Sequence, residues 1–101
     1  MILEANILGL TLAKLTARLR AEHGLGASDE GLLVMAVDMS SEAYEKGLRA
    51  GDLISEAGNR DVASVTDLEK QLSDLKVGGR KSVLFLTRRQ GDPRFVVLKL
   101  E

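Results

Sequence analysis

The chain offers few side chains that could carry out catalysis. It contains one histidine, His23, and no cysteine, which excludes a two-histidine mechanism, a thiolate nucleophile and a cysteine-ligated metal. A serine nucleophile needs a base to accept its proton, and His23 stands where a short helix is expected to end. The Gly-x-Ser-x-Gly pattern of a serine nucleophile does not occur. We therefore assign no catalytic residue to this chain, and the question of an enzyme stays open for any longer parent protein.

Other residues of possible chemical interest have simpler structural explanations. Gly24-Leu25-Gly26 could begin a dinucleotide-binding loop, but Asp29 stands where the third glycine is needed. The acidic pair Asp29-Glu30 has no metal-ligand partners nearby and is expected to be solvated surface. The basic pair Arg88-Arg89 is expected to keep a hairpin tip soluble, with an anionic partner as the alternative. Neither a cofactor nor a metal site is predicted.

The segment Ile7-Leu8-Gly9-Leu10 could bind an anion through its backbone. A chain that bends at a glycine can direct consecutive N–H groups towards one point, and such a nest holds a carboxylate without a charged side chain. The C-terminus of a peptide is a ligand of this kind. The residues that follow, 10–13, would then present a free strand edge to which an extended peptide adds. The alternative is an ordinary strand over 7–13 with a bulge at Gly9.

The longest predicted helix covers residues 64–75. Ser64 and Asp67 have the spacing of a capping box, in which side chains satisfy the free amides at a helix start. Apolar residues at positions 65, 68, 72 and 75 form one stripe along the helix. This helix would supply the far wall of a groove beside residues 7–13. The side chains expected to form an apolar pocket for the last ligand residue are Leu8, Leu10 and Leu72.

The composition describes one domain with no marked charge. Of the 101 residues 45% are hydrophobic, which is enough for a core. Fourteen basic and 15 acidic residues leave a net charge of -1, and aromatic residues make up 3%, so that no nucleic-acid partner is expected. No run reaches the length of a membrane span, and the start of the chain lacks the pattern of a signal peptide. We expect residues 1–6 to be an N-terminal extension and 7–101 to be the domain.

The order of the expected elements indicates a mixed α+β fold that is mainly β. Short helices are expected at 17–23 and from Ser40 or Ser41, and a closing hairpin is expected to turn at Asp92-Pro93. That hairpin breaks the strict alternation of strand and helix that a parallel sheet requires. The expected architecture is a small, partly open β-barrel of about five strands, capped by one long and two short helices. The predicted strands are 7–13, 31–38, 53–57, 81–88 and 94–100.

Several of these segments together resemble PDZ domains. Ile7-Leu8-Gly9-Leu10 resembles the carboxylate-binding loop of that family, and residues 47–54, Gly-Leu-Arg-Ala-Gly-Asp-Leu-Ile, are similar to its most specific turn, G-L-x-x-G-D-x-I. The helix 64–75 is similar to the second PDZ helix, and the resemblance extends over residues 7–100. Starting at the carboxylate loop and ending on a hairpin is the circularly permuted bacterial arrangement. The segment 15–25 further resembles the second, C-terminal PDZ domain of HtrA/Deg-type periplasmic serine proteases.

The resemblance implies a peptide-binding groove. The amides of residues 8–10 would bind the terminal carboxylate, and residues 10–13 would pair with the peptide. Three residues of the helix would face the groove, while Leu68 and Leu75 would point to the core. One departure from the family's pattern is Glu4, which stands where a lysine or arginine is common. The implied site residues are Leu8, Gly9, Leu10, Thr11, Leu12, Val65, Glu69 and Leu72.

The implied function is the binding of C-terminal or unfolded segments by β-strand addition, for substrate recruitment or regulation in protein quality control. The parent would be a periplasmic serine endopeptidase that carries its catalytic residues elsewhere. Expected partners are peptide C-termini or unfolded polypeptide, the protease domain and other PDZ domain of the parent, and further copies in a homo-oligomer. Two alternatives remain: a structural PDZ domain that assembles the protease cage without binding peptide, and the PDZ module of another protease or secretion system.

Overall fold

The computed structural model describes residues 4–26 and 29–100, in which seven strands form one antiparallel sheet. The main strand order is β1-β2-β3-β4-β6-β7, and β5 pairs with β4. The expected mainly β class with one long and two short helices is confirmed, and two short strands, β1 and β5, add to the five expected. The strands are β1 (Glu4–Ile7), β2 (Leu10–Lys14), β3 (Leu32–Val37), β4 (Leu53–Ala57), β5 (Arg60–Asp61), β6 (Ser82–Arg89) and β7 (Asp92–Lys99). The helices are α1 (Ala17–Glu22), α2 (Glu42–Glu45) and α3 (Val65–Val77).

Each helix begins at a hydroxyl side chain that accepts a hydrogen bond from an amide three residues later. The N-cap residues are Thr16 of α1, Ser41 of α2 and Ser64 of α3. Such a bond satisfies one of the amides that a helix start leaves free. The sequence predicted the caps Thr16 and Ser64 and left Ser40 or Ser41 open for α2, where the structure has Ser41.

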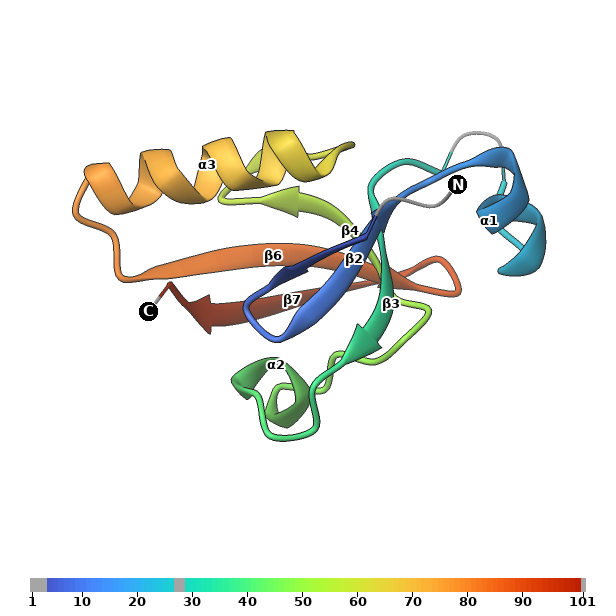
Figure 1. Cartoon of the computed structure of the whole chain (residues 1–101), viewed down its shortest axis with the longest axis horizontal. Coiled ribbons are helices and arrows are strands. Elements are labelled where there is room, and N and C mark those ends of the chain that lie inside the picture. The colour runs from blue at the N-terminus through green and yellow to red at the C-terminus, as the bar shows by residue number, and fades with distance from the viewer. Residues whose placement is uncertain (1–3, 27–28, 101) are drawn as a thin grey trace.

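The main core lies between the curved sheet and α3. Figure 1 shows α3 lying along one side of the sheet, and its contacts are with β2 and β4. Phe85 at the centre of β6 is fully buried, and α3 contributes Leu68 and Leu72. A second, smaller cluster under α1 is formed by Ala13, Leu19 and Leu33. The two clusters together fix both ends of β2.

The closing hairpin turns two residues earlier than expected. Arg89 pairs with Asp92, so the turn is Gln90-Gly91, both with positive φ, and Pro93 lies within β7. The prediction of a turn at Asp92-Pro93 is therefore wrong. Lys99, at the other end of β7, donates its N–H to Glu42 Oε1 at 2.7 Å instead of to β6. Pro93 and Lys99 are an even number of residues apart in β7, so their backbone nitrogens face the same side of the strand, away from β6. The N–H that proline lacks is therefore not needed for the β6–β7 hydrogen bonds, as is usual for proline on an edge strand.

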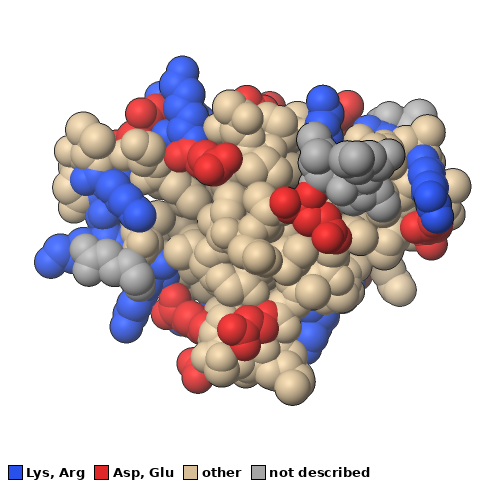
Figure 2. All heavy atoms as spheres, viewed as in Figure 1, with Lys and Arg blue, Asp and Glu red and all other residues tan. Residues whose placement is uncertain are grey.

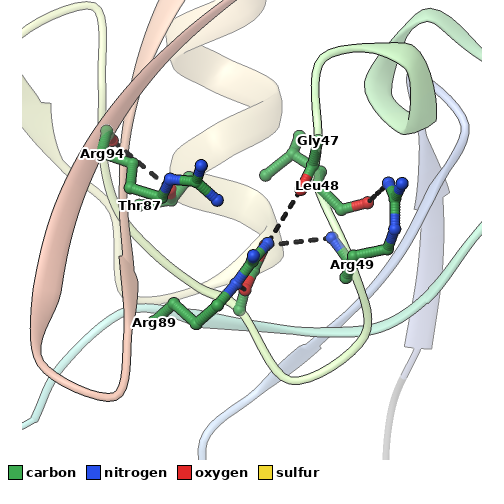
Figure 3. A network of polar contacts seen from close by, with 7 residues as sticks. Gly47, Leu48, Arg49, Thr87, Arg89 and Arg94 are labelled. Carbon is green, nitrogen blue, oxygen red and sulfur yellow. Dashed lines mark hydrogen bonds and ion pairs between the residues drawn. The ribbon is translucent and has the colours of Figure 1, made fainter.

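A buried carboxylate holds the Gly47–Asp52 turn to the end of β6. Asp52 is only 2% exposed and accepts hydrogen bonds from Arg89 Nε at 2.7 Å and Arg89 Nη2 at 2.9 Å. Asp52 also accepts from the Arg49 amide at 3.0 Å, and Arg89 Nη2 donates to the Gly47 carbonyl at 2.8 Å. Figure 3 shows Arg89 reaching across to this turn. The expectation that Arg89 serves only solubility is therefore wrong, and its hydrogen bonds to Asp52 raise its pKa further above the usual range.

We expect Arg89→Met to destabilise the fold, because it leaves the buried Asp52 carboxylate without its cationic partner. The free energy of unfolding, measured by urea denaturation, should fall by about 2–3 kcal/mol. The matched control is Arg88→Met, one residue away on the same strand and exposed, which should change it by less than about 0.5 kcal/mol. Equal effects of the two substitutions would contradict this role of the ion pair.

Candidate functional site

The strand edge that the sequence offered to a peptide is already paired. β2 pairs with β3 on one side and with β1 on the other, in a register that runs from Glu4 opposite Ala13 to Ile7 opposite Leu10. The two strands lie side by side in Figure 1. The prediction of a free edge over residues 10–13 is therefore wrong, because residues 4–7 of the same chain occupy it. Residues 4–6, expected to be an extension, belong to this strand; residues 1–3 lie outside the described part of the chain.

Leu8 and Gly9 form the two-residue turn of this hairpin. Their φ angles are 54° and 83°, and two consecutive positive values are characteristic of the type I′ turn that joins antiparallel strands. Residues 7–13 are therefore not one strand with a bulge at Gly9. A register shift does occur in β2, but between Thr11 and Leu12 on the side of β3.

Gly9 is fixed by the segment that follows β3. Its carbonyl accepts a hydrogen bond from the Asp38 amide at 2.8 Å. A Cβ added to Gly9 would overlap the Cβ of Ser41 and lie 2.8 Å from its Oγ. The backbone approaches so closely here that only glycine fits. Among the described residues, the N–H groups of Leu8 and Gly9 form no hydrogen bond, so both donors are available at this turn.

A shallow hollow of about 380 Å³ lies between the β1–β2 turn and α3. Of the implied site residues, the structure brings Leu8, Glu69 and Leu72 together here. Ser73 and Lys76, which the sequence analysis missed, share the helix face of Glu69 at spacings of four and seven residues. The full lining is Asn6, Ile7, Leu8, Glu69, Leu72, Ser73, Lys76 and Leu100.

The remaining implied residues lie elsewhere. Leu10 and Leu12 are buried in the main core, so the expected pocket of Leu8, Leu10 and Leu72 is not formed as predicted. Val65 is half-buried against the core and does not line the hollow. Thr11 faces the neighbouring strand, and its Oγ1 donates to Asn6 Oδ1 at 2.8 Å. The side of the pocket expected from Leu10 is supplied by Ile7 and Leu100.

Charged side chains lie mainly towards the rim of the face of the domain that Figure 2 shows. Figure 2 shows few of them across its middle, and both signs are present around it. Glu69 and Lys76 place one negative and one positive group on the helix wall of the hollow. The helix wall of the hollow therefore carries one charged group of each sign beside apolar side chains, and no strong field of one sign.

The other polar residues that the sequence singled out have structural roles. His23 caps the end of α1 as expected, with its amide bonded to the Leu19 carbonyl at 3.0 Å. A larger hollow, of about 760 Å³, lies beside the Gly47–Asp52 turn, but its Arg89 is held by Asp52, and Arg49 donates to backbone carbonyls. Within the described residues, no group of three or more acidic, histidine or cysteine side chains could hold a metal. No described helix is long and apolar enough to cross a membrane.

Gly9→Ala tests whether the turn depends on its close contact with Ser41. The natural control is Gly91→Ala, because Gly91 has nearly the same φ, 85°, but has open space where a Cβ would lie. Both variants bear the cost of an alanine at positive φ, and only Gly9→Ala adds the overlap. We expect Gly9→Ala to lower the free energy of unfolding by about 1–3 kcal/mol more than its control in urea denaturation. The contact has no such role if the two variants unfold alike.

The comparisons with known proteins agree with this geometry. The family model described as "PDZ domain" matches residues 7–100. A probable periplasmic serine endoprotease DegP-like of Bartonella henselae is 37% identical over 83 residues, which are 78% of this chain and 16% of that protein. The protein of the same name from Chlamydia trachomatis is 36% identical over 93 residues, 91% of this chain and 18% of its own length. The chain thus spans less than a fifth of these relatives.

Two solved structures share the fold. The first is "HtrA-type protease AlgW with decapeptide", with a TM-score of 0.76 at 22% identity, over 97% of this chain and 29% of that one. The second is the HtrA3 PDZ domain bound to a phage-derived ligand, FGRWV, with a TM-score of 0.66 at 20% identity, over 96% and 92% of the two chains. Together with the match over residues 7–100, they show that the chain belongs to the PDZ domain family.

Proposed function

We propose that this PDZ domain binds extended polypeptide segments at the outer edge of β2, as the recruitment module of a longer periplasmic serine endoprotease. The observation that carries the proposal is the pairing of β1 with β2, because it shows the edge holding an antiparallel strand of four residues. The last of these residues, Ile7, lines the hollow beside α3. An external strand in the same direction would bring its C-terminus to the Leu8-Gly9 turn.

The groups at this turn suit a terminal carboxylate. The unpaired amides of Leu8 and Gly9 would donate to its oxygens, as in an anion-binding nest. The last side chain of the ligand would contact Leu72 in the place that Ile7 now holds. About four backbone hydrogen bonds of about 1 kcal/mol each and one buried aliphatic side chain of about 2 kcal/mol correspond to a Kd of about tens of micromolar at best. Such an affinity suits the transient capture of substrates.

The relatives support the wider role. AlgW and the HtrA3 PDZ domain were both solved with a peptide, and the curated relatives are named periplasmic serine endoproteases. We infer a parent protein of that kind, with its catalytic residues outside this chain and its location in the periplasm. The protease domain, a further PDZ domain and other copies of the parent would be the intramolecular and oligomeric partners.

A second candidate is favoured by one observation. Because β1 already pairs with β2, the domain in this state has no open edge at the groove. A domain closed in this way would serve the assembly of the protease cage and would bind no peptide. Titration with peptides separates the two functions.

We expect a peptide that ends in Glu-Ala-Asn-Ile with a free carboxylate to shift the amide NMR signals of β2, with a Kd no tighter than about tens of micromolar. The amidated form of the same peptide should bind at least about tenfold more weakly, because it lacks the charge that the amides at the turn would bind. Equal binding of the two forms would rule out the nest, and no shift with either peptide, or with FGRWV, would favour the assembly function.

Leu72→Glu should abolish this binding by placing a carboxylate in the apolar wall of the hollow. The control is Thr66→Glu, which is exposed on the same helix and away from the hollow. Since Leu72 also belongs to the core, we add Ser73→Trp, an exposed position whose indole would fill the hollow. Ser73→Trp should weaken binding by at least about tenfold in a variant with an unchanged circular dichroism spectrum. Unchanged affinity in Ser73→Trp would place the peptide elsewhere.

A further inference from the structure

We propose that β1 is an internal ligand of the groove between β2 and α3, so that an external peptide must displace it. The inference rests on the proposed function, because it concerns the regulation of the same site. It follows from three properties of β1: its direction and register, its side-chain pattern, and its weak attachment to the rest of the fold.

The direction of β1 is that of a bound peptide. It runs antiparallel to β2 and reaches the turn with its C-terminal residue, Ile7. All four of its residues have a direct partner on β2, and the Thr11 hydroxyl adds a hydrogen bond to the Asn6 side chain at 2.8 Å. A peptide and β1 would use the same backbone groups of β2, so the two cannot bind together.

The side chains of β1 alternate in burial along the strand. Ala5 and Ile7 are half-buried, while Glu4 and Asn6 are exposed. Ile7 packs against the main core beside Leu8. This pattern defines the class of peptide that would compete best: an aliphatic last residue, a small residue two positions before it, and between them a polar side chain that can accept a hydrogen bond from Thr11.

The attachment of β1 to the fold is weak. It ends the strand order of the sheet, with β2 as its one neighbour, and none of its residues is fully buried. In β2, by contrast, Leu10, Leu12 and Ala13 are fully buried. The turn between the two strands also holds Leu8 at a φ of 54°, where the backbone of any residue other than glycine is strained. The release of β1 would therefore leave the core and the β2–β3 pairing in place.

A disulfide across the hairpin tests the proposal. Asn6 and Thr11 stand directly opposite each other, which brings Cα atoms within the range of a disulfide, and the chain has no other cysteine. In the double variant Asn6→Cys with Thr11→Cys, oxidation would lock β1 onto β2. We expect the oxidised form to lose binding of the Glu-Ala-Asn-Ile peptide and the reduced form of the same protein to regain it.

The matched control places the same chemistry at the other edge of the sheet. Leu86 and Phe95 are a directly opposite pair on β6 and β7, and neither lines the hollow. In Leu86→Cys with Phe95→Cys, oxidation should leave the Kd of the peptide unchanged. If the locked β1–β2 hairpin binds peptide as tightly as its reduced form, the inference is overturned.

A second variant acts in the opposite sense. Ala5→Pro removes a backbone N–H from β1 and hinders its pairing, whereas Ala5→Val keeps a residue that favours strands. If the open form of the groove is about 10% populated, Ala5→Pro should lower the apparent Kd by about tenfold relative to Ala5→Val. Equal affinities of the two variants would overturn the inference and leave the proposed function standing. Absence of binding in Ala5→Pro and in both reduced double variants, all folded, would instead reject the proposed function.

Discussion

The hydrogen-bonding capacity of β2 is the constraint on which this domain depends. Three of its side chains are packed in the core, so its position is set, and β3 satisfies one of its edges. The backbone groups on the other edge need partners from water, from a ligand or from the chain itself. In this structure the partner is β1. A peptide bound at this edge would therefore use the same row of backbone groups that β1 uses in the folded chain.

The Leu8-Gly9 turn links this choice to the rest of the fold. The carbonyl of Gly9 is bonded to the Asp38 amide, and its α-carbon lies against Ser41, the N-cap of α2. Through α2 the turn is connected to β7, whose last residue bonds to Glu42. The Leu8-Gly9 turn is thus held to packed backbone through Gly9. Its other side, at Leu8, is joined to the edge strand β1, so the proposed exchange of strands would leave the base of the turn at Gly9 fixed.

The sequence predicted the elements whose signals are local and missed those decided by competition for an edge. The caps at Thr16 and Ser64 and the apolar stripe of α3 are short-range patterns and were found, and the cap of α2 was narrowed to Ser40 or Ser41. The β1–β2 hairpin was missed because its turn is Leu-Gly instead of Asn-Gly, the usual signal for two positive φ values. The pairing of Arg89 with Asp52 joins residues 37 positions apart, which no local pattern contains. In the helix wall of the site, Leu72 followed from the apolar stripe and Glu69 from the resemblance to PDZ domains, whereas Ile7 and Leu100 line the hollow only through tertiary packing.

The strength of the β1 contact follows from opposing effects. A short tether gives β1 an effective concentration of about millimolar at the groove, which exceeds a Kd of about tens of micromolar by about two orders of magnitude. The strained φ of Leu8 costs about 1–2 kcal/mol in the closed state and offsets about one of those orders. A glycine at position 8 would remove this strain and close the groove more firmly. In the proposed exchange of strands, leucine at this position would serve two purposes. Its side chain lines the hollow, and its strained backbone would keep the closed state only slightly favoured, so that an external strand of modest affinity could open it.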